Sequence, residues 1–239
     1  MINHNYQRVT SAQVAVAAGI PASIISDVSG RRGALDGRIR TMVPGSRLCG
    51  PALTVEVRPG DNLMIHAALV LAQAGDVLVI DGKGCMTSAL MGELMCAHAQ
   101  AAGIAGVVID GAVRDVAELR VGDLPVFACG SSPNGPTRGL AGRIGYPVSL
   151  GGVSITPGDL ILGDDDGVVA SPREGLDQIL SLASLKIAAE AQRRQDIDEG
   201  RLVYGWLEGA LKDVGALSQQ GSLKALVSEF SGSRDSARH

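Results

Sequence analysis

Three charged residues in the middle of the chain could do chemistry together. Glu93 follows a glycine early in a helix-forming run, and Arg114 with Asp115 follows the next apolar run along the chain. Carboxylates are ligands for hard cations, and a guanidinium binds a substrate carboxylate through paired hydrogen bonds. Gly92–Met95 also offers backbone N–H groups near a helix beginning, where anions bind. A hard cation on Asp115, a carboxylate substrate and the Arg114 guanidinium could therefore meet at one site.

A strand–helix–strand unit is predicted to position these residues. Val77–Ile80 and Val107–Ile109 are β-branched runs that end in Asp-Gly, which is typical of buried parallel strands. Between them, Ala89–Ala102 is rich in good helix formers and closes at Gly103. Because loops at the carboxyl ends of parallel strands meet at one edge of a sheet, we expect the charged residues to converge there.

The residues alone leave other interpretations open. Glu93 could simply interact favourably with the dipole at the start of its helix, and Arg114 with Asp115 could be a surface ion pair. Lys83, in a glycine loop at a strand end, could form a Schiff base with a carbonyl substrate. His66 lies on a predicted helix, where a histidine bonded to a structural partner is the ordinary expectation.

The composition favours a cytoplasmic globular protein. Hydrophobic residues make up 46% of the 239 positions, and the formal net charge of −4 argues against a nucleic-acid partner. The four cysteines form no CxxC pair, which favours a reducing compartment. No apolar run approaches the roughly 20 residues of a membrane span, and the N-terminal residues do not have the pattern of a signal peptide. We therefore expect no membrane partner.

The remaining elements are predicted from periodicity and turn residues. Asp61 is a plausible N-cap for a helix over Asn62–Ala74, and Ser171 is one for a long helix that follows. Two segments, Arg31–Arg47 and Ser131–Arg143, are expected to shape the distal part of the pocket. The other expected elements are helices over Ser11–Ala18, from Ile24 and over Leu202–Leu211, and strands over Leu53–Val57, Pro125–Ala128, Val148–Ile155, Asp159–Leu162 and Val168–Ala170.

The predicted domain organisation has three parts. Residues 1–170 form an α/β catalytic core, and residues 171–217 form a C-terminal helical extension that is expected to pack on a neighbouring subunit. Residues 218–239 are expected to be a partly disordered tail, because they end in a short polar sequence.

Several short motifs together give the sequence a resemblance to the RraA-like family, from Gly50 to Pro172. The resemblance is closest to its metal-dependent aldolases for 4-hydroxy-4-methyl-2-oxoglutarate and 4-carboxy-4-hydroxy-2-oxoadipate. It implies an α/β fold, a swivelling-type α/β/β sandwich with a central, largely parallel sheet and a C-terminal helical extension, assembled as homotrimers or homohexamers. The motifs are Gly50–Val55, Pro59–Asn62, Gly75–Val79, Gly92–Leu94, Asp110–Asp115, Pro157–Asp159 and Asp164–Val168.

The resemblance also implies roles for the central residues. Asp115 would bind Mg2+ or Mn2+ directly, and Glu93 would bind it through water. Arg114 would contact the pyruvyl oxygens of a 2-oxo acid, and the backbone of Gly92, Glu93, Leu94 and Met95 would receive its carboxylate. The implied reaction is retro-aldol cleavage to pyruvate and a second oxo acid, with oxaloacetate decarboxylation as a side activity.

Two features of the family bear on the assignment of these roles to this chain. Some aldolases use a glutamate from the C-terminal segment of a neighbouring subunit. The aligned position here is Arg201, and Glu199, two residues earlier, is the candidate that could reach the metal through water. The family also contains a non-catalytic regulator of ribonuclease E, whose branch tends to lack the aspartate after the arginine. Asp115 is present in this chain.

Overall fold

The computed structural model describes the backbone of residues 1–235 and the side chains of residues 1–230. The chain forms two compact units, one over Met1–Ile187 and one that begins at Ala188. The strands of the first unit are β1 (Arg40–Thr41), β2 (Leu48–Glu56), β3 (Val77–Met91), β4 (Gly106–Val113), β5 (Val126–Ser131), β6 (Arg143–Ile144), β7 (Val148–Leu150), β8 (Val153–Ile155), β9 (Leu160–Asp164) and β10 (Gly167–Ser171).

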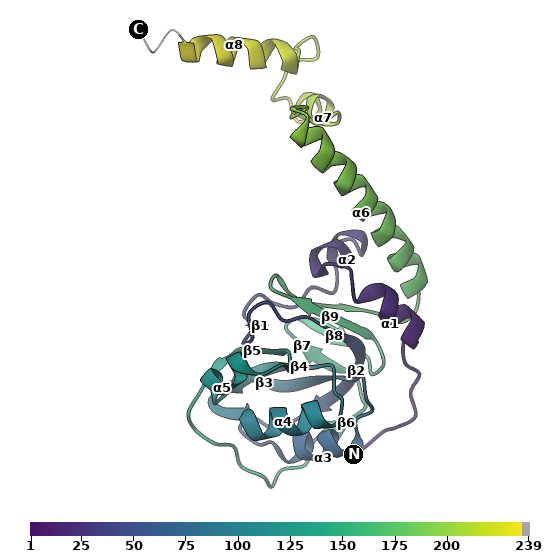
Figure 1. Cartoon of the computed structure of the whole chain (residues 1–239), viewed down its shortest axis with the longest axis vertical. Coiled ribbons are helices and arrows are strands. Elements are labelled where there is room, and N and C mark those ends of the chain that lie inside the picture. Colours follow the sequence, from purple (N-terminus) through teal and green to yellow (C-terminus); the bar gives the residue numbers. More distant parts are fainter. Residues whose placement is uncertain (236–239) are drawn as a thin grey trace. The chain divides into compact units, whose positions relative to one another are not determined.

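The first unit also contains helices, which lie on both sides of its strands (Figure 1). They are α1 (Ser11–Ala17), α2 (Ala22–Val28), α3 (Leu63–Leu71), α4 (Glu93–Ala101), α5 (Val116–Val121) and the beginning of α6 (Leu176–Asp198). The second unit holds the end of α6, then α7 (Leu207–Asp213) and α8 (Leu223–Asp235).

A mixed sheet with a parallel centre carries the fold. Its strand order is β1-β5-β4-β3-β2-β9-β10, and β6 also pairs with β2. Strands β2, β3, β4 and β5 are parallel, whereas β1, β9 and β10 run antiparallel to their neighbours. Strands β7 and β8 form a separate hairpin. The predicted α/β class with a central, largely parallel sheet is confirmed.

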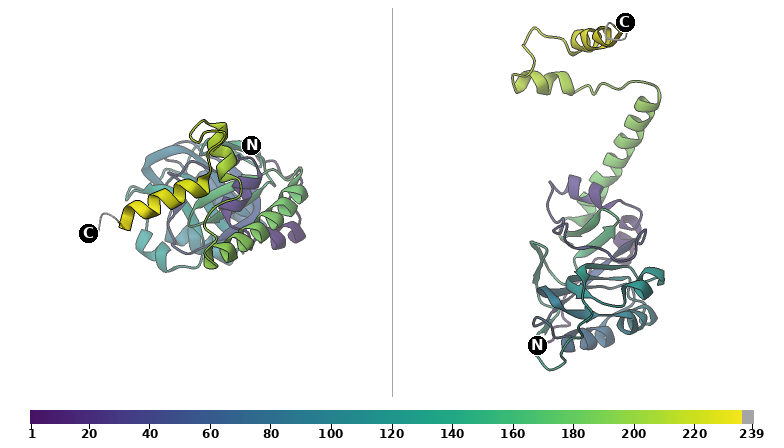
Figure 2. Two further views of the ribbon diagram at one scale, coloured as in Figure 1. Left: turned by 90° about the horizontal axis from the view of Figure 1, so that it is seen from above. Right: turned by 90° about the vertical axis from the view of Figure 1, so that its left-hand side faces the viewer.

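Alternate residues of the parallel strands pack against different layers. Leu78, Ile80 and Ile109 contact the apolar side chains of α3, α4 and α5 on one face of the sheet. Val77 and Val79 point to the other face, where they pack on β7, β8, β9 and β10. Figures 1 and 2 show α3 and α4 on one side of the parallel strands. On the other side, α1 and α2 lie beyond the layer formed by β7, β8, β9 and β10. Burial on both faces explains why these strands read as continuous apolar runs.

The helix predicted over Ala89–Ala102 begins later than expected. Strand β3 continues to Met91, because Ala89 pairs with Ala112 and Met91 pairs with Val113 of β4. The register shifts along this extension, which absorbs the predicted glycine loop around Lys83 into the strand. Helix propensity at these positions is overridden by the pairing of two buried strands. Helix α4 consequently starts at Glu93, with Gly92 at its N-cap.

Other predicted helix starts are also shifted. Ser171 is the last residue of β10, paired with Leu160, and α6 begins only at Leu176, so the predicted N-cap is wrong. Asn62, not Asp61, occupies the N-cap position of α3. The segment expected as a partly disordered tail contains α8, and its last residues, 236–239, lie outside the described residues.

None of the helices in the described part of the chain is long and apolar enough to span a membrane alone. Helices α1 and α2 satisfy the length and hydropathy criteria only as a pair, which is bent by 106° at the break between them.

Candidate active site

A cavity of about 410 Å³ opens at the carboxyl ends of β3 and β4. The predicted site residues reach it from the two adjacent strand ends, because Gly92 directly follows β3 and Arg114 directly follows β4. The cavity lining includes the six predicted site residues that belong to the first unit, namely Gly92, Glu93, Leu94, Met95, Arg114 and Asp115.

Asp115 connects the two strand ends. Its Oδ2 atom accepts a hydrogen bond of 3.0 Å from the backbone N–H of Glu93, and it lies 3.6 Å from Nε of Arg114. The backbone N–H of Arg114 in turn donates to the carbonyl oxygen of Met91 at 3.0 Å. The side chains of Arg114 and Asp115 are 44% and 39% exposed, so a small molecule can reach both.

Asp115 also has an unusual backbone conformation. It lies in the left-handed region, with φ 57° and ψ 43°, at the N-cap position of α5. A non-glycine residue rarely adopts this conformation, and aspartate and asparagine are the types that tolerate it best. From this conformation the Asp115 carboxylate accepts its hydrogen bond from the start of α4. Residues with strained backbone of this kind cluster at functional sites.

Gly92 leaves no room for a side chain. A Cβ atom at this position would lie 2.3 Å from Oδ2 of Asp115 and 2.9 Å from Cγ of Arg114. The glycine therefore lets the backbone of the α4 start approach the charged pair, which is a common reason for glycine beside a functional group.

The backbone N–H groups of Gly92–Met95 are only partly available to an anion. Glu93 donates to Asp115, and Met95 donates to the carbonyl oxygen of Gly92 at 3.2 Å. Leu94, in the first turn of α4, has no intrahelical acceptor for its N–H. A substrate carboxylate would therefore find the Leu94 N–H, with the Arg114 guanidinium lining the same cavity.

Three carboxylates line the cavity, and their chemistry fits a magnesium ion. Asp115 and Glu93 were predicted, and Glu118 is added by α5, one turn beyond Asp115. The i, i+3 spacing of Asp115 and Glu118 could have indicated a shared helix face. Among the described residues no group of three or more His, Cys, Asp or Glu side chains is arranged to enclose a metal ion. Mg2+ commonly binds through one or two carboxylates and several waters, so the donor set suits it.

Cys96, beneath this cluster, does not offer a nucleophile. Burial, together with the negative charges of Asp115 and Glu93, raises the pKa of the Cys96 thiol to about 12. The thiolate is the reactive form of cysteine, so this side chain packs as a small apolar group.

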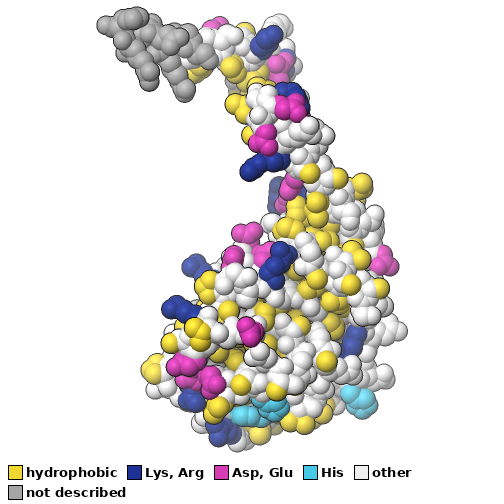
Figure 3. Space-filling model, viewed as in Figure 1, with side chains coloured by type: hydrophobic (Ala, Val, Ile, Leu, Met, Phe, Trp, Pro, Cys, Tyr) yellow, Lys and Arg dark blue, Asp and Glu magenta, His cyan; other side chains and the backbone are white. Residues whose placement is uncertain are grey.

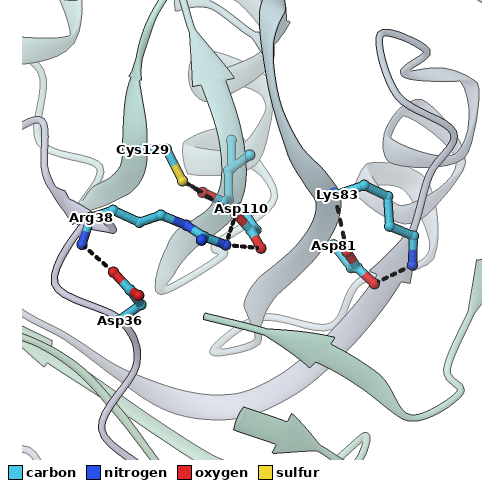
Figure 4. A network of polar contacts seen from close by, with 7 residues as sticks. Asp36, Arg38, Asp81, Lys83, Asp110 and Cys129 are labelled. Carbon is cyan, nitrogen blue, oxygen red and sulfur yellow. Dashed lines mark hydrogen bonds and ion pairs between the residues drawn. The ribbon is translucent and has the colours of Figure 1, made fainter. Parts of the chain in front are cut away.

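Lys83 lies outside the cavity lining, in the network shown in Figure 4. Its Nζ atom is 2.6 Å from Oδ2 of Asp81 and 3.4 Å from Oε1 of Glu56. The hydrogen bond to Asp81 and the charge of both carboxylates raise the pKa of Lys83, despite partial desolvation. A Schiff-base lysine needs a lowered pKa to be a nucleophile at neutral pH, so this environment disfavours that role.

The segments expected to shape the distal pocket differ in what they contribute. The loop Ser131–Arg143 supplies Pro136 and Arg138 to the cavity. Arginines of the Arg31–Arg47 segment instead make contacts elsewhere: Arg38 pairs with the buried Asp110 (Figure 4), and Arg47 donates to the Ile20 carbonyl oxygen. No residue of that segment is among the cavity lining in the described part of the chain.

Glu199 lies in the second unit, where it forms an ion pair with Arg201. Arg201 also pairs with Asp196, so Glu199 is part of a local charge cluster after α6. A metal-binding role for Glu199 through water stays a prediction.

Asp61 anchors the loop that carries Arg138. The buried Oδ2 atom of Asp61 accepts hydrogen bonds from the Thr137 hydroxyl at 2.8 Å and from the N–H groups of Gly139 and Leu140 at 2.7 and 3.2 Å. Its Oδ1 atom accepts the Leu63 N–H at 3.0 Å. Asp61 thereby joins the start of α3 to the loop.

Replacing Asp61 by Asn is expected to lower the free energy of unfolding by roughly 1–3 kcal/mol at neutral pH, because the amide cannot accept all these bonds. Burial alone would raise the pKa of Asp61, but the hydrogen bonds from Gly139, Leu63, Thr137 and Leu140 outweigh it and lower the pKa. The carboxylate therefore contributes its stability above the ordinary aspartate pKa, and the contribution is lost as the pH falls through the lowered value.

Urea unfolding of the Asp61→Asn variant over a series of pH values tests this expectation. The difference from the unmodified protein should shrink as the pH falls into the acid range. The exposed Asp123, changed to Asn, is the matched control and should show little effect. A difference that stays constant down to low pH would contradict the role given to the carboxylate charge.

Two comparisons with known sequences decide the family. The RraA-like family model (Aldolase/RraA) matches residues 15–170. The chain belongs to the RraA-like family. It is also 38% identical over 190 residues to the Halalkalibacterium halodurans protein named "Putative 4-hydroxy-4-methyl-2-oxoglutarate aldolase", an alignment that covers 79% of this chain and 90% of that one.

Solved structures of RraA-like proteins have the same fold. An uncharacterized protein from Pseudomonas syringae pv. tomato aligns with a TM-score of 0.75 and 25% identity, over 83% of this chain and 93% of that one. Streptomyces coelicolor RraAS2, described as an unusual member of the RNase ES inhibitor RraA protein family, aligns with a TM-score of 0.68 and 25% identity. That alignment covers 82% of this chain and all of the other. RraA-like proteins thus carry names of both enzymes and inhibitors.

Proposed function

We propose that this protein is a divalent-metal-dependent aldolase that cleaves 4-hydroxy-4-methyl-2-oxoglutarate or 4-carboxy-4-hydroxy-2-oxoadipate. The products would be pyruvate and a second oxo acid, and oxaloacetate decarboxylation would be a side activity. The observation that carries the proposal is the Arg114–Asp115 pair held against the glycine start of α4 in one open cavity. The named relative from Halalkalibacterium halodurans points to the same substrate class.

In this proposal Asp115 holds Mg2+ or Mn2+ directly, and Glu93 holds it through water. When bound, the cation supplies Lewis-acid polarisation of the keto and carboxylate oxygens of the pyruvyl group. The Arg114 guanidinium and the Leu94 N–H bind the same carboxylate and orient the substrate in the cavity.

Cleavage requires the C4 hydroxyl to lose its proton as the C3–C4 bond breaks. Glu93 lines the cavity and accepts this proton, directly or through a solvent molecule. The bonding electrons move into the pyruvyl half, which becomes the enolate of pyruvate, and Arg114 stabilises its developing negative charge. Protonation at C3 then gives pyruvate. Oxaloacetate gives the same enolate when its C4 carboxylate leaves as CO2.

Two alternatives to this function make different predictions. A non-catalytic regulator of ribonuclease E activity, suggested by inhibitors among the structural neighbours, would release no pyruvate from any 2-oxo acid. A Schiff-base lyase would depend on Lys83 and would be trapped by borohydride in the presence of pyruvate.

The proposed function is tested by incubating the purified protein with 4-hydroxy-4-methyl-2-oxoglutarate, 4-carboxy-4-hydroxy-2-oxoadipate and oxaloacetate in the presence of Mg2+. Pyruvate is expected from all three. Each 4-hydroxy-4-methyl-2-oxoglutarate should give two molecules, because its second oxo acid is itself pyruvate, and each molecule of the other two substrates should give at least one. Absence of pyruvate with every substrate would contradict the proposal and favour the regulator.

A further inference from the structure

We propose that a second cavity, lined by Arg32, Asp159 and Ser171, binds an α-amino acid with an apolar side chain. This cavity has a volume of about 430 Å³, and residues of α6, β8 and β10 contribute to its walls. It shares no lining residue with the candidate active site. The inference therefore does not depend on the proposed aldolase function.

The two cavities border different layers of the first unit. Histidine side chains gather over α3 and α4, the helices beside the candidate active site, on the face of the molecule shown in Figure 3. His66 of α3 lines that first cavity, and its buried Nε2 atom has no partner among the described residues, so the expected structural partner is not found. The second cavity is bordered instead by the end of α2, by β8 and β10, and by the beginning of α6. A ligand there would occupy a separate site.

Ser171 holds a hydroxyl that the fold leaves without a partner. The residue lines the second cavity and is only 2% exposed. Its Oγ atom is buried and forms no hydrogen bond in the described part of the chain. Buried polar atoms are nearly always hydrogen-bonded in folded proteins, and an unpaired one is costly. A ligand in the cavity would supply the missing hydrogen bond.

Arg32 brings an unpaired positive charge to the same cavity. It lines the cavity, and its guanidinium forms no hydrogen bond or ion pair with the residues that the structure describes. The adjacent Gly33 holds this segment against β10, because a Cβ atom there would lie 2.1 Å from the carbonyl oxygen of Ala170. The Gly33 carbonyl oxygen accepts the Ala170 N–H at 2.8 Å. Arg32 is thereby held near the end of β10 that carries Ser171, and a guanidinium binds carboxylates through paired hydrogen bonds.

The beginning of α6 adds to this preference for a carboxylate. Gly175 and Gln178 line the cavity at the start of this helix of 23 residues. The positive end of a helix dipole favours an anion. Glu174 also lines the cavity, but its carboxylate is paired with Arg173, so its charge is balanced.

Asp159 provides a buried negative charge in the same lining. Its Oδ2 atom accepts the Thr156 N–H at 2.8 Å, and its Oδ1 atom accepts the Arg173 N–H at 3.2 Å. Each carboxylate oxygen has two lone pairs, so the side chain can accept a further hydrogen bond. Burial raises the pKa of Asp159, and the negative charge of Glu174 adds to this rise. A ligand ammonium beside Asp159 would favour its charged form.

A zwitterion matches this arrangement better than a ligand with one sign of charge. The α-carboxylate would bind Arg32 and the Ser171 hydroxyl, and the α-ammonium would bind Asp159. A simple carboxylate would leave Asp159 unpaired, and a simple amine would leave Arg32 unpaired. The remaining wall suits an aliphatic side chain, since its apolar residues include Val153, Ala170, Pro172 and Ile179.

Titration calorimetry of the full-length protein with L-leucine, L-isoleucine, L-valine and L-methionine tests the proposal. We expect saturable binding of at least one of the four. Analogues that lack the ammonium or the carboxylate, which for leucine are 4-methylpentanoate and 3-methylbutylamine, should bind more weakly by roughly tenfold or more. Absence of saturable binding with all four amino acids, or equally tight binding of either analogue, would overturn the proposal.

Two variants locate the site. Arg32→Gln should weaken binding by roughly tenfold or more, whereas Arg31→Gln is the matched control, because Arg31 is exposed and lies outside the lining. Ser171→Ala should also weaken binding, while the unfolding temperature of the ligand-free protein stays the same or rises, because an unpaired buried hydroxyl is removed. A lower unfolding temperature with unchanged affinity would show that Ser171 has a structural role only.

Pyruvate distinguishes the second cavity from the candidate active site, where the carboxylate of an amino acid could also bind. Because the two cavities share no residue, saturating pyruvate with Mg2+ should not displace the amino acid, and Arg114→Ala should bind it normally. Competitive displacement by pyruvate, or binding that Arg114→Ala loses and Arg32→Gln keeps, would contradict the assignment to the second cavity.

Discussion

The Arg114→Ala variant is expected to lower kcat for pyruvate release by roughly a hundredfold to a thousandfold, the cost of removing one group that stabilises developing negative charge. The guanidinium lies near Asp115 and lines the cavity, and the Arg114 side chain is 44% exposed. The unfolding temperature should therefore change little. Steady-state kinetics with 4-hydroxy-4-methyl-2-oxoglutarate and thermal unfolding of the same preparations measure both quantities.

Arg120→Ala is the matched control for this loss, because Arg120 lies on the neighbouring helix α5 and outside the cavity. Arg114→Lys separates charge from geometry: the ammonium keeps the charge but loses the planar pair of donors. We expect an intermediate loss for the lysine variant. Normal turnover by Arg114→Ala would show that the site is assigned to the wrong residues.

Gly92→Ala is expected to disable the site while the rest of the fold remains. The added Cβ would lie 2.3 Å from Oδ2 of Asp115 and 2.9 Å from Cγ of Arg114, so both groups must move. A displacement of about 1 Å in a reacting group can cost on the order of a hundredfold in rate, and we expect a loss of that size in kcat/KM. The affinity for Mn2+, measured by paramagnetic relaxation or titration calorimetry, should fall as well.

Gly19→Ala is the control for this change, because a Cβ at Gly19 meets no atom within 4 Å. It should keep both the activity and the affinity for Mn2+. Full activity in Gly92→Ala would mean that Asp115 and Arg114 need not hold the positions seen in this structure.

The convergence of Arg114 and Asp115 on Gly92 could be predicted from the sequence. Two buried parallel strands that end close to these residues must bring them to the same edge of the sheet, and β3 and β4 do so. The exact start of α4 could not be predicted, because Ala89 and Met91 are good helix formers. Their pairing with β4 is a tertiary effect that local propensity does not contain.

The distal part of the cavity could be predicted only in part: the loop Ser131–Arg143 was expected there and supplies Arg138, whereas the contribution of α3 was not expected. Asn62 and His66 read as ordinary residues of an apolar helix, and Arg138 as one charge in a polar loop. What brings them together is the buried Asp61 carboxylate, which bonds to the backbone of residues 139 and 140. Backbone hydrogen bonds between segments far apart in the chain leave no pattern in a single sequence.

The contact of Lys83 with two carboxylates is likewise a tertiary feature. Asp81 is two residues away, and its contact could be inferred locally, but Glu56 comes from the neighbouring parallel strand β2. The resulting rise in the Lys83 pKa disfavours the Schiff-base mechanism, which needs a lysine with a lowered pKa.

The most direct test of the account is pyruvate release from 4-hydroxy-4-methyl-2-oxoglutarate by the purified protein, measured after treatment with EDTA and again after Mg2+ is restored. We predict that EDTA abolishes the activity, that Mg2+ or Mn2+ recovers it, and that borohydride with pyruvate leaves Lys83 unmodified. Activity that is indifferent to EDTA and is lost to borohydride would contradict the metal-dependent mechanism.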